Sequence, residues 1–260
     1  MLSFFKKLLK PKENNIAKNE FSQNEYCYQN TICPYCNNKL HKLPSNKIKC
    51  KNCNQNVYCR TSPVNGSKLL LTEEQLTRVR FLKAEKSKQN WIEELCHRHT
   101  VSKNDFIKTK IFLSKKHCIE IDDYDVILYM INSKTTKYKT ENNWGVYSTA
   151  YLDMADILFE HGNLENSLNY FLHVCYLDLN GPMNYEGFNK EDLKKHPPFN
   201  PKNSFIAPYV VDQIINIMEK LNLDVDDLKK IFIEFNSEFQ IPYINLNTKQ
   251  AWNLLKDYLC

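Results

Sequence analysis

The chain has few glycines, few arginines and no long apolar run, and each shortage argues against a class of protein. Its five glycines form neither a Walker loop nor a dinucleotide-binding loop, so nucleotide phosphates lack their usual backbone cradle. The patterns G-x-S-x-G and H-E-x-x-H of two hydrolase classes are also missing. The longest apolar stretch, residues 205–211, is far shorter than the about 20 residues that cross a bilayer. The sequence therefore favours a protein that is neither an integral membrane protein nor an enzyme, although an enzyme of unknown class stays an open alternative.

Cysteine, by contrast, is plentiful and occurs in a telling pattern. Cys33 and Cys36 form one Cys-x-x-Cys pair, Cys50 and Cys53 form a second, and thirteen residues separate the pairs. A tight turn can aim both thiolates of a pair at one point, and four thiolates complete the tetrahedral shell of a structural Zn²⁺. Because a closed shell leaves no position for water or substrate, we expect one structural zinc ion that performs no chemistry. Residues 31–62 resemble a zinc ribbon, which implies a small β-hairpin fold and no particular activity.

Composition and position divide the chain into three expected regions. Residues 1–26 are a basic amphipathic N-terminus followed by a flexible linker, residues 27–66 are the zinc ribbon, and residues 67–260 are an α-helical domain. The 42% hydrophobic and 12% aromatic content can fill a sizeable core. Four of the ten cysteines are assigned to zinc and no secretory signal precedes them, so we expect a reducing, cytoplasmic location.

Positive charge is concentrated at the N-terminal end. Residues 1–60 carry eleven Lys or Arg against three acids. The ribbon places basic residues beside Tyr35 and Tyr58, a combination that suits nucleic acid. Only four arginines occur in the whole chain, so non-specific attraction to phosphate is favoured over base reading. The candidate nucleic-acid surface comprises Lys39, Lys42, Lys47, Lys49, Lys51 and Arg60. In the alternative reading these side chains only keep a small protein-docking ribbon soluble.

Helix signals dominate after residue 72. A capping box at residues 72–75 marks a first helix, and helix starts of a similar kind follow at Ser102 and Asp122. Residues 148–180 show two amphipathic stretches joined at Gly162 and resemble a tetratricopeptide hairpin. Because no second copy is evident, the domain is expected to be a helical bundle or a short tetratricopeptide-like solenoid. The Pro- and Asn-rich excursion at 180–208 is a long connection whose role the sequence leaves open.

A second metal site is a further candidate. Two segments of the helical part carry His and Cys, namely Cys96, His97 and His99 in one, and His117 and Cys118 in the other. They could bind a second metal ion if two helices brought them together. The alternative is that these residues serve packing and the surface near helix ends.

Several motifs taken together resemble a family. They are C-P-Y-C, K-C-K-N-C, V-Y-C-R-T, L-L-x-T-E-E-Q, N-W-G-V-Y and V-C-Y-L-D-L-N-G. Their order is similar to that in a group of uncharacterised bacterial and phage proteins with an N-terminal zinc ribbon followed by a helical domain. The resemblance implies the architecture and no activity. The leading hypothesis is a non-enzymatic interaction protein whose basic ribbon contacts nucleic acid and whose helical domain contacts a protein partner. A pure protein–protein adaptor is the alternative.

Overall fold

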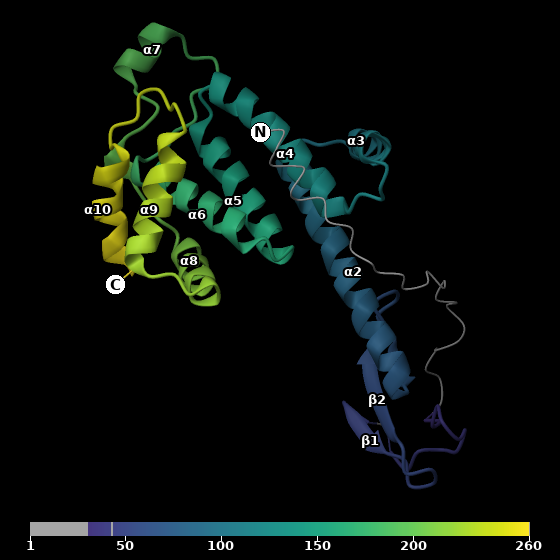
Figure 1. Ribbon diagram of the computed structural model, residues 1–260. Helices are drawn as coiled ribbons and strands as arrows, with labels where there is room; N and C mark the ends of the chain where they lie inside the picture. The colour runs from purple at the N-terminus through teal and green to yellow at the C-terminus, as the bar shows by residue number, and fades with distance from the viewer. Residues whose placement is uncertain (1–30, 43, 260) are drawn as a thin grey trace. The chain divides into compact units, whose positions relative to one another are not determined.

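The structure is a computed structural model that describes residues 31–42 and 44–259. The predicted N-terminal segment 1–26, with its amphipathic opening, lies outside the described residues, as does Cys27. Contacts divide the described chain between Glu94 and Leu95 into two units, which we call the sheet unit and the helical unit (Figure 1). The division falls inside a helix, so the start of that helix belongs with the sheet. The domain boundary near residue 66 expected from the sequence stays a prediction.

The sheet unit contains a three-stranded antiparallel sheet. Strands β1 (Lys47–Lys49), β2 (Asn56–Thr61) and β3 (Lys68–Leu71) lie in the order β1-β2-β3. The sequence between the cysteine pairs predicts a strand, a turn at 44–46 and a second strand that leads into Cys50. Strand β1 is the second of these, whereas the first is reduced to an isolated bridge between Ile32 and Lys39, so that part of the prediction was wrong.

Alternation along the strands gives the sheet two different apolar faces. One face carries Val57 and Cys59 of β2 and Leu70 of β3, packed with Leu40 and the first cysteines of both pairs. The opposite face uses Leu69 and Leu71 against the first turns of the following helix, whose buried contacts are Leu76 and Val79.

Helix α2 (Glu73–Arg98) begins at the predicted capping box. The backbone N–H of Gln75 donates to Thr72 Oγ1 at 3.2 Å, and the N–H of Thr72 donates to Gln75 Oε1 at 2.8 Å. Both bonds satisfy donors that the first turn of a helix leaves open. Further along, no residue from 80 to 91 is buried, although Leu82, Lys88 and Trp91 are partly covered.

The helical unit contains the remaining helices of the described residues, which hold nine α-helices in all. They are α3 (Lys103–His117), α4 (Asp123–Thr140), α5 (Trp144–Glu160), α6 (Leu164–Leu179), α7 (Lys190–Lys195), α8 (Pro208–Leu221), α9 (Val225–Ser237) and α10 (Thr248–Leu259). Helix α3 packs on α4, α4 on α5, and α5 on α6, while α8, α9 and α10 cover the other side of α6 (Figure 1). A mainly helical chain with a small antiparallel sheet is therefore confirmed. No helix in this described part is both long and apolar enough to cross a membrane.

The α5–α6 hairpin forms the centre of this unit. Gly162 ends α5 with a positive φ of 72°, a conformation that glycine adopts without strain. Ser167 of α6 is fully buried and donates its hydroxyl to the carbonyl oxygen of Ala155 in α5 at 2.8 Å. A small residue is needed there because the helix backbones approach closely. Helix α4 packs against α5, while α8, α9 and α10 pack against α6.

The excursion at 180–208 contributes a few buried residues to the core. Asn180 is fully buried, and its side-chain oxygen accepts from the N–H groups of Asn245 and Leu246 at 3.1 and 2.7 Å. Phe199 is also fully buried against Trp144, with ring centroids 5.1 Å apart. The excursion thus covers the start of α5 and connects to the segment before α10.

Candidate metal centre

The four predicted cysteine ligands lie together. Their Sγ atoms all lie within 4.8 Å of one another, in the group Cys33, Cys36, Cys50 and Cys53. The Sγ atoms of Cys33 and Cys53 are 3.7 Å apart, and those of Cys36 and Cys50 are 3.8 Å apart. A tetrahedral ion with metal–sulfur bonds of about 2.3 Å has sulfurs about 3.8 Å from one another, so the cluster has the dimensions of a four-thiolate metal site.

Each of the two cysteine pairs is held by a backbone turn of the same kind. In the first, the N–H of Asn37 donates to the carbonyl oxygen of Cys33 at 3.0 Å, and in the second the N–H of Asn54 donates to that of Cys50 at 2.9 Å. Asn37 and Asn54 have positive φ angles of 58° and 57°, a conformation that Asn tolerates better than most side chains. The asparagine after each pair is therefore a structural residue that the spacing argument missed. Its signal is the repeated pattern Cys-x-x-Cys-Asn.

Both turns also direct backbone N–H groups at the sulfurs. The backbone N–H groups of Tyr35 and Cys36 act to lower the pKa of the Cys33 thiol, and those at the matching positions of the second pair, Asn52 and Cys53, act to lower the pKa of the Cys50 thiol. The N–H of Asn38 lowers the pKa of the Cys36 thiol to about 6. For Cys33, burial outweighs its donors and raises the pKa to about 12. A nearby cation lowers thiol pKa values, so a metal would release the protons that burial retains.

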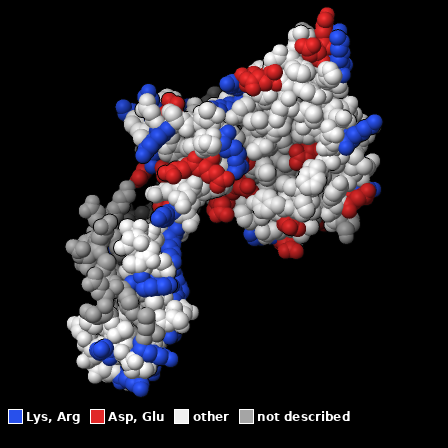
Figure 2. Space-filling view, turned by 180° about the vertical axis from the view of Figure 1, so that it is seen from behind, with Lys and Arg blue, Asp and Glu red and all other residues white. Residues whose placement is uncertain are grey.

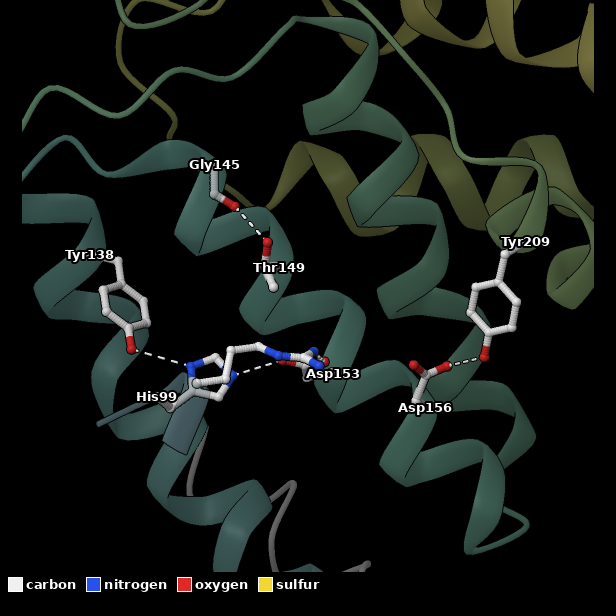
Figure 3. A network of polar contacts seen from close by, with 8 residues as sticks. His99, Tyr138, Gly145, Thr149, Asp153, Asp156 and Tyr209 are labelled. Atoms are coloured by element: carbon white, nitrogen blue, oxygen red, sulfur yellow. Dashed lines mark hydrogen bonds and ion pairs between the residues drawn. The ribbon is translucent and has the colours of Figure 1, made fainter. Parts of the chain in front are cut away.

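The second candidate set is not gathered into a site. Among the described residues, the ligand atoms of Cys96, His97, His99, His117 and Cys118 form no group of metal-site dimensions. His99 instead lies buried at the end of α2, where its Nε2 is 2.8 Å from Asp153 Oδ2 of α5 and its Nδ1 is 3.2 Å from the Tyr138 hydroxyl of α4 (Figure 3). Arg98 pairs with the same carboxylate. The packing alternative is therefore the one that the structure supports for His99.

The candidate basic residues separate into two groups by their place on the sheet unit. Lys47 and Lys49 of β1 lie on the same sheet face as Tyr58 and Arg60 of β2, because Lys47 is paired with Tyr58 and alternate residues share a face. The Lys47 ammonium lies 5.4 Å from the Tyr58 ring centroid. Lys39, Lys42 and Lys51 belong to the turns around the cysteines instead and are exposed there.

Arg60 makes hydrogen bonds within the sheet unit. Its Nη1 donates to the carbonyl oxygens of Asn46 at 3.0 Å and Cys59 at 2.7 Å, and also to the Asn46 side chain. These bonds fix the chain just before β1. They also hold the guanidinium beside the lysines of that strand, which concentrates positive charge on this face.

The part of the sheet unit before α2 carries charge of one sign. Residues 31–72 contain seven Lys or Arg and no Asp or Glu. Figure 2 shows blue Lys and Arg side chains scattered over the lower part of the visible face, where the sheet unit lies, with red acidic groups gathered elsewhere. A Zn²⁺ ion with four thiolates has a formal charge of about −2, so the occupied site would reduce this positive charge without cancelling it.

No family model, curated protein or solved structure matches this chain. The features of the molecule that bear on its function are therefore the cysteine cluster, the charge of the sheet unit and the packing of the helical unit.

Proposed function

We propose that Cys33, Cys36, Cys50 and Cys53 bind one structural Zn²⁺ and that the surrounding residues form a zinc ribbon. The sulfur spacing and the paired backbone turns support this proposal. Four thiolates in a tetrahedron suit zinc, and iron is the other common occupant of such a shell. Elemental analysis of the purified protein tests the choice. We expect one zinc per chain, and one iron in its place would refute the assignment.

The function that we propose for this ribbon is contact with the phosphate backbone of nucleic acid. One observation carries the proposal: Lys47, Lys49 and Arg60 share one sheet face beside an aromatic ring, in a segment without a single acid. Clustered lysines attract phosphates without reading bases. The Tyr58 ring itself packs against the cluster of Leu69 and Leu71 on this face, so the lysines supply the contact. The closed metal shell makes the ribbon a binding element and not a catalytic one.

The helical unit gives less support to a specific role. Its tetratricopeptide-like pattern predicts a protein-binding groove, but the α5–α6 hairpin is covered by α4 on one side and by α8, α9 and α10 on the other. A protein partner for this unit stays a prediction from the sequence. The family resemblance to ribbon-bearing bacterial and phage proteins also stays a prediction from the sequence.

Fluorescence anisotropy of the zinc-loaded protein with labelled single-stranded and duplex DNA and RNA tests the proposed function. The informative variant is Lys47→Glu/Lys49→Glu, which reverses two charges on the proposed face. The matched control is Lys39→Glu/Lys51→Glu, which makes the same change in net charge in the cysteine turns. We expect the first pair to abolish measurable binding at physiological salt and the second to weaken it only modestly. Affinity of the unaltered protein should fall steeply as salt rises.

Two results would overturn this reading. Equal loss in both double variants would mean that net charge alone attracts nucleic acid, without a defined face. No binding at low salt would mean that the lysines are a solvated surface, as the adaptor alternative holds. Retention of one zinc per chain in each variant is the necessary control for folding.

A further inference from the structure

Helix α3 has an outer surface that stays exposed and on which no described helix or strand packs. The helix packs on α4, and Leu113 is its one buried residue. Three large apolar side chains remain outside: Ile107 is 47% exposed, Ile111 49% and Phe112 51%. Three such residues within six positions of one helix form a patch, in contrast to the single exposed apolar side chains found on most protein surfaces.

The sequence arranges this surface as two parallel rows. Residues four apart lie above one another on a helix, so α3 exposes two adjacent rows of four. Each row is apolar near its middle and ends in a lysine at its C-terminal side. The first row is Lys103, Ile107, Ile111 and Lys115, and the second is Asn104, Lys108, Phe112 and Lys116.

The charges on these rows are of one sign. None of the eight residues is acidic. Asp105 is occupied at the helix start, where its N–H and one carboxylate oxygen bond the Ser102 hydroxyl at 3.0 and 2.7 Å. Lys110, on the side toward α4, pairs with Asp123 at 2.5 Å. The outer surface therefore combines an apolar centre with lysines along its borders.

We propose that this outer surface of α3 binds an anionic lipid surface. Ile107, Ile111 and Phe112 would enter the region between headgroups and acyl chains, while the flanking lysines reach the lipid phosphates. Nucleic acid fits this helix less well, because phosphates and base edges offer nothing to two exposed isoleucines. An acidic protein segment would satisfy the lysines, but it would need its own apolar row in register. The proposal concerns the helical unit and does not depend on the zinc ribbon.

Vesicle co-sedimentation of the full-length protein tests this assignment. The protein is mixed with vesicles of phosphatidylcholine and phosphatidylglycerol, or with vesicles of phosphatidylcholine alone. We expect binding to the anionic vesicles only. The variant Ile107→Gln/Ile111→Gln/Phe112→Gln should lower the partition coefficient by about 100-fold, since three half-exposed apolar side chains no longer leave water. Because this triple variant keeps every charge, a loss of vesicle binding could not be attributed to the basic sheet unit.

The matched control is Phe205→Gln, which removes a more exposed aromatic side chain, 70% exposed, from another part of the helical unit. It should bind vesicles as well as the unaltered protein does. Glutamine is compatible with helix, so unchanged circular dichroism and melting would show that the triple variant is folded.

Three outcomes would overturn the proposal. One is no binding of the unaltered protein to anionic vesicles. Another is unchanged binding of the triple glutamine variant. The third is equal loss in the Phe205→Gln control. If the triple variant instead lost binding to nucleic acid in the anisotropy assay while keeping its vesicle binding, α3 would belong to a nucleic-acid surface.

Discussion

Removal of the metal should unfold the sheet unit and leave most of the helical unit folded. Structural zinc contributes an apparent binding free energy on the order of 10 kcal/mol or more, whereas whole domains are stable by about 5–15 kcal/mol. The apolar cluster beside the cysteines includes only Leu40, Val57 and Leu70 besides buried cysteines. The shared cation keeps the four cysteine side chains together. Without the ion, only this small apolar core would do so.

The assay is hydrogen exchange followed by mass spectrometry, with and without a zinc chelator. Peptides from residues 31–71 should lose protection, and so should the first turns of α2, whose Leu76 and Val79 pack on the sheet. Peptides from α5 and α6 should keep theirs. A single cooperative loss of protection across the whole described chain would refute this reasoning, because it would show that the helical unit depends on the metal.

A matched pair of cysteine variants isolates the metal from the thiol. Cys50→Ala removes a proposed ligand and should give the chelated exchange pattern even in added zinc. Cys59→Ala removes a thiol that is 5% exposed in the same apolar cluster but lies outside the four-sulfur group. It should keep one zinc per chain and cost about 1–2 kcal/mol of stability. Loss of zinc in both variants would contradict the ligand assignment.

Two other predictions concern the helical unit. Gly181 has a φ of 64°, and an added Cβ would lie 1.9 Å from the Asn200 carbonyl oxygen, so Gly181→Ala should cost more than about 3 kcal/mol in thermal melts. Gly162→Ala, with a similar φ but open space around it, should cost only about 1 kcal/mol, and equal costs would contradict the steric argument. Burial raises the pKa of Asp178 to about 6 despite the hydroxyl that Ser148 donates to it at 2.8 Å. The folded state therefore holds this proton more tightly than the unfolded state does, and the free energy of unfolding should fall as pH rises from about 4 to 6. Denaturant titrations of Asp178→Asn should lack this part of the fall, and an unchanged pH profile would refute the prediction.

Local signals predicted the parts of the fold that depend on neighbouring residues. The capping box of α2 and the hairpin around Gly162 both follow from side chains within a few positions of one another. The cysteine cluster was predictable for the same reason, since spacing within each pair limits how the thiols can point. The asparagines after the pairs were equally local but were overlooked.

Features that depend on distant segments were not predictable. The periodicity of α10 marks Leu254 and Tyr258 as core residues, yet they are 45% and 51% exposed, and Trp252 is buried in their place. Trp252 packs against Phe232 of α9, and the two ring centroids are 5.6 Å apart. The bond from His99 to Asp153 likewise joins residues 54 positions apart, and no local pattern distinguishes it from a metal ligand.

The stretch of α2 without buried residues has a consequence for how the chain can be handled. Because no residue from 80 to 91 is buried, this stretch should open locally more often than the buried helices of the described chain. This stretch contains Arg80, Lys83, Lys86 and Lys88, each a cleavage site for trypsin. Mild digestion should therefore cut here first, and the chain offers at this place a natural position for preparing its two halves as separate fragments.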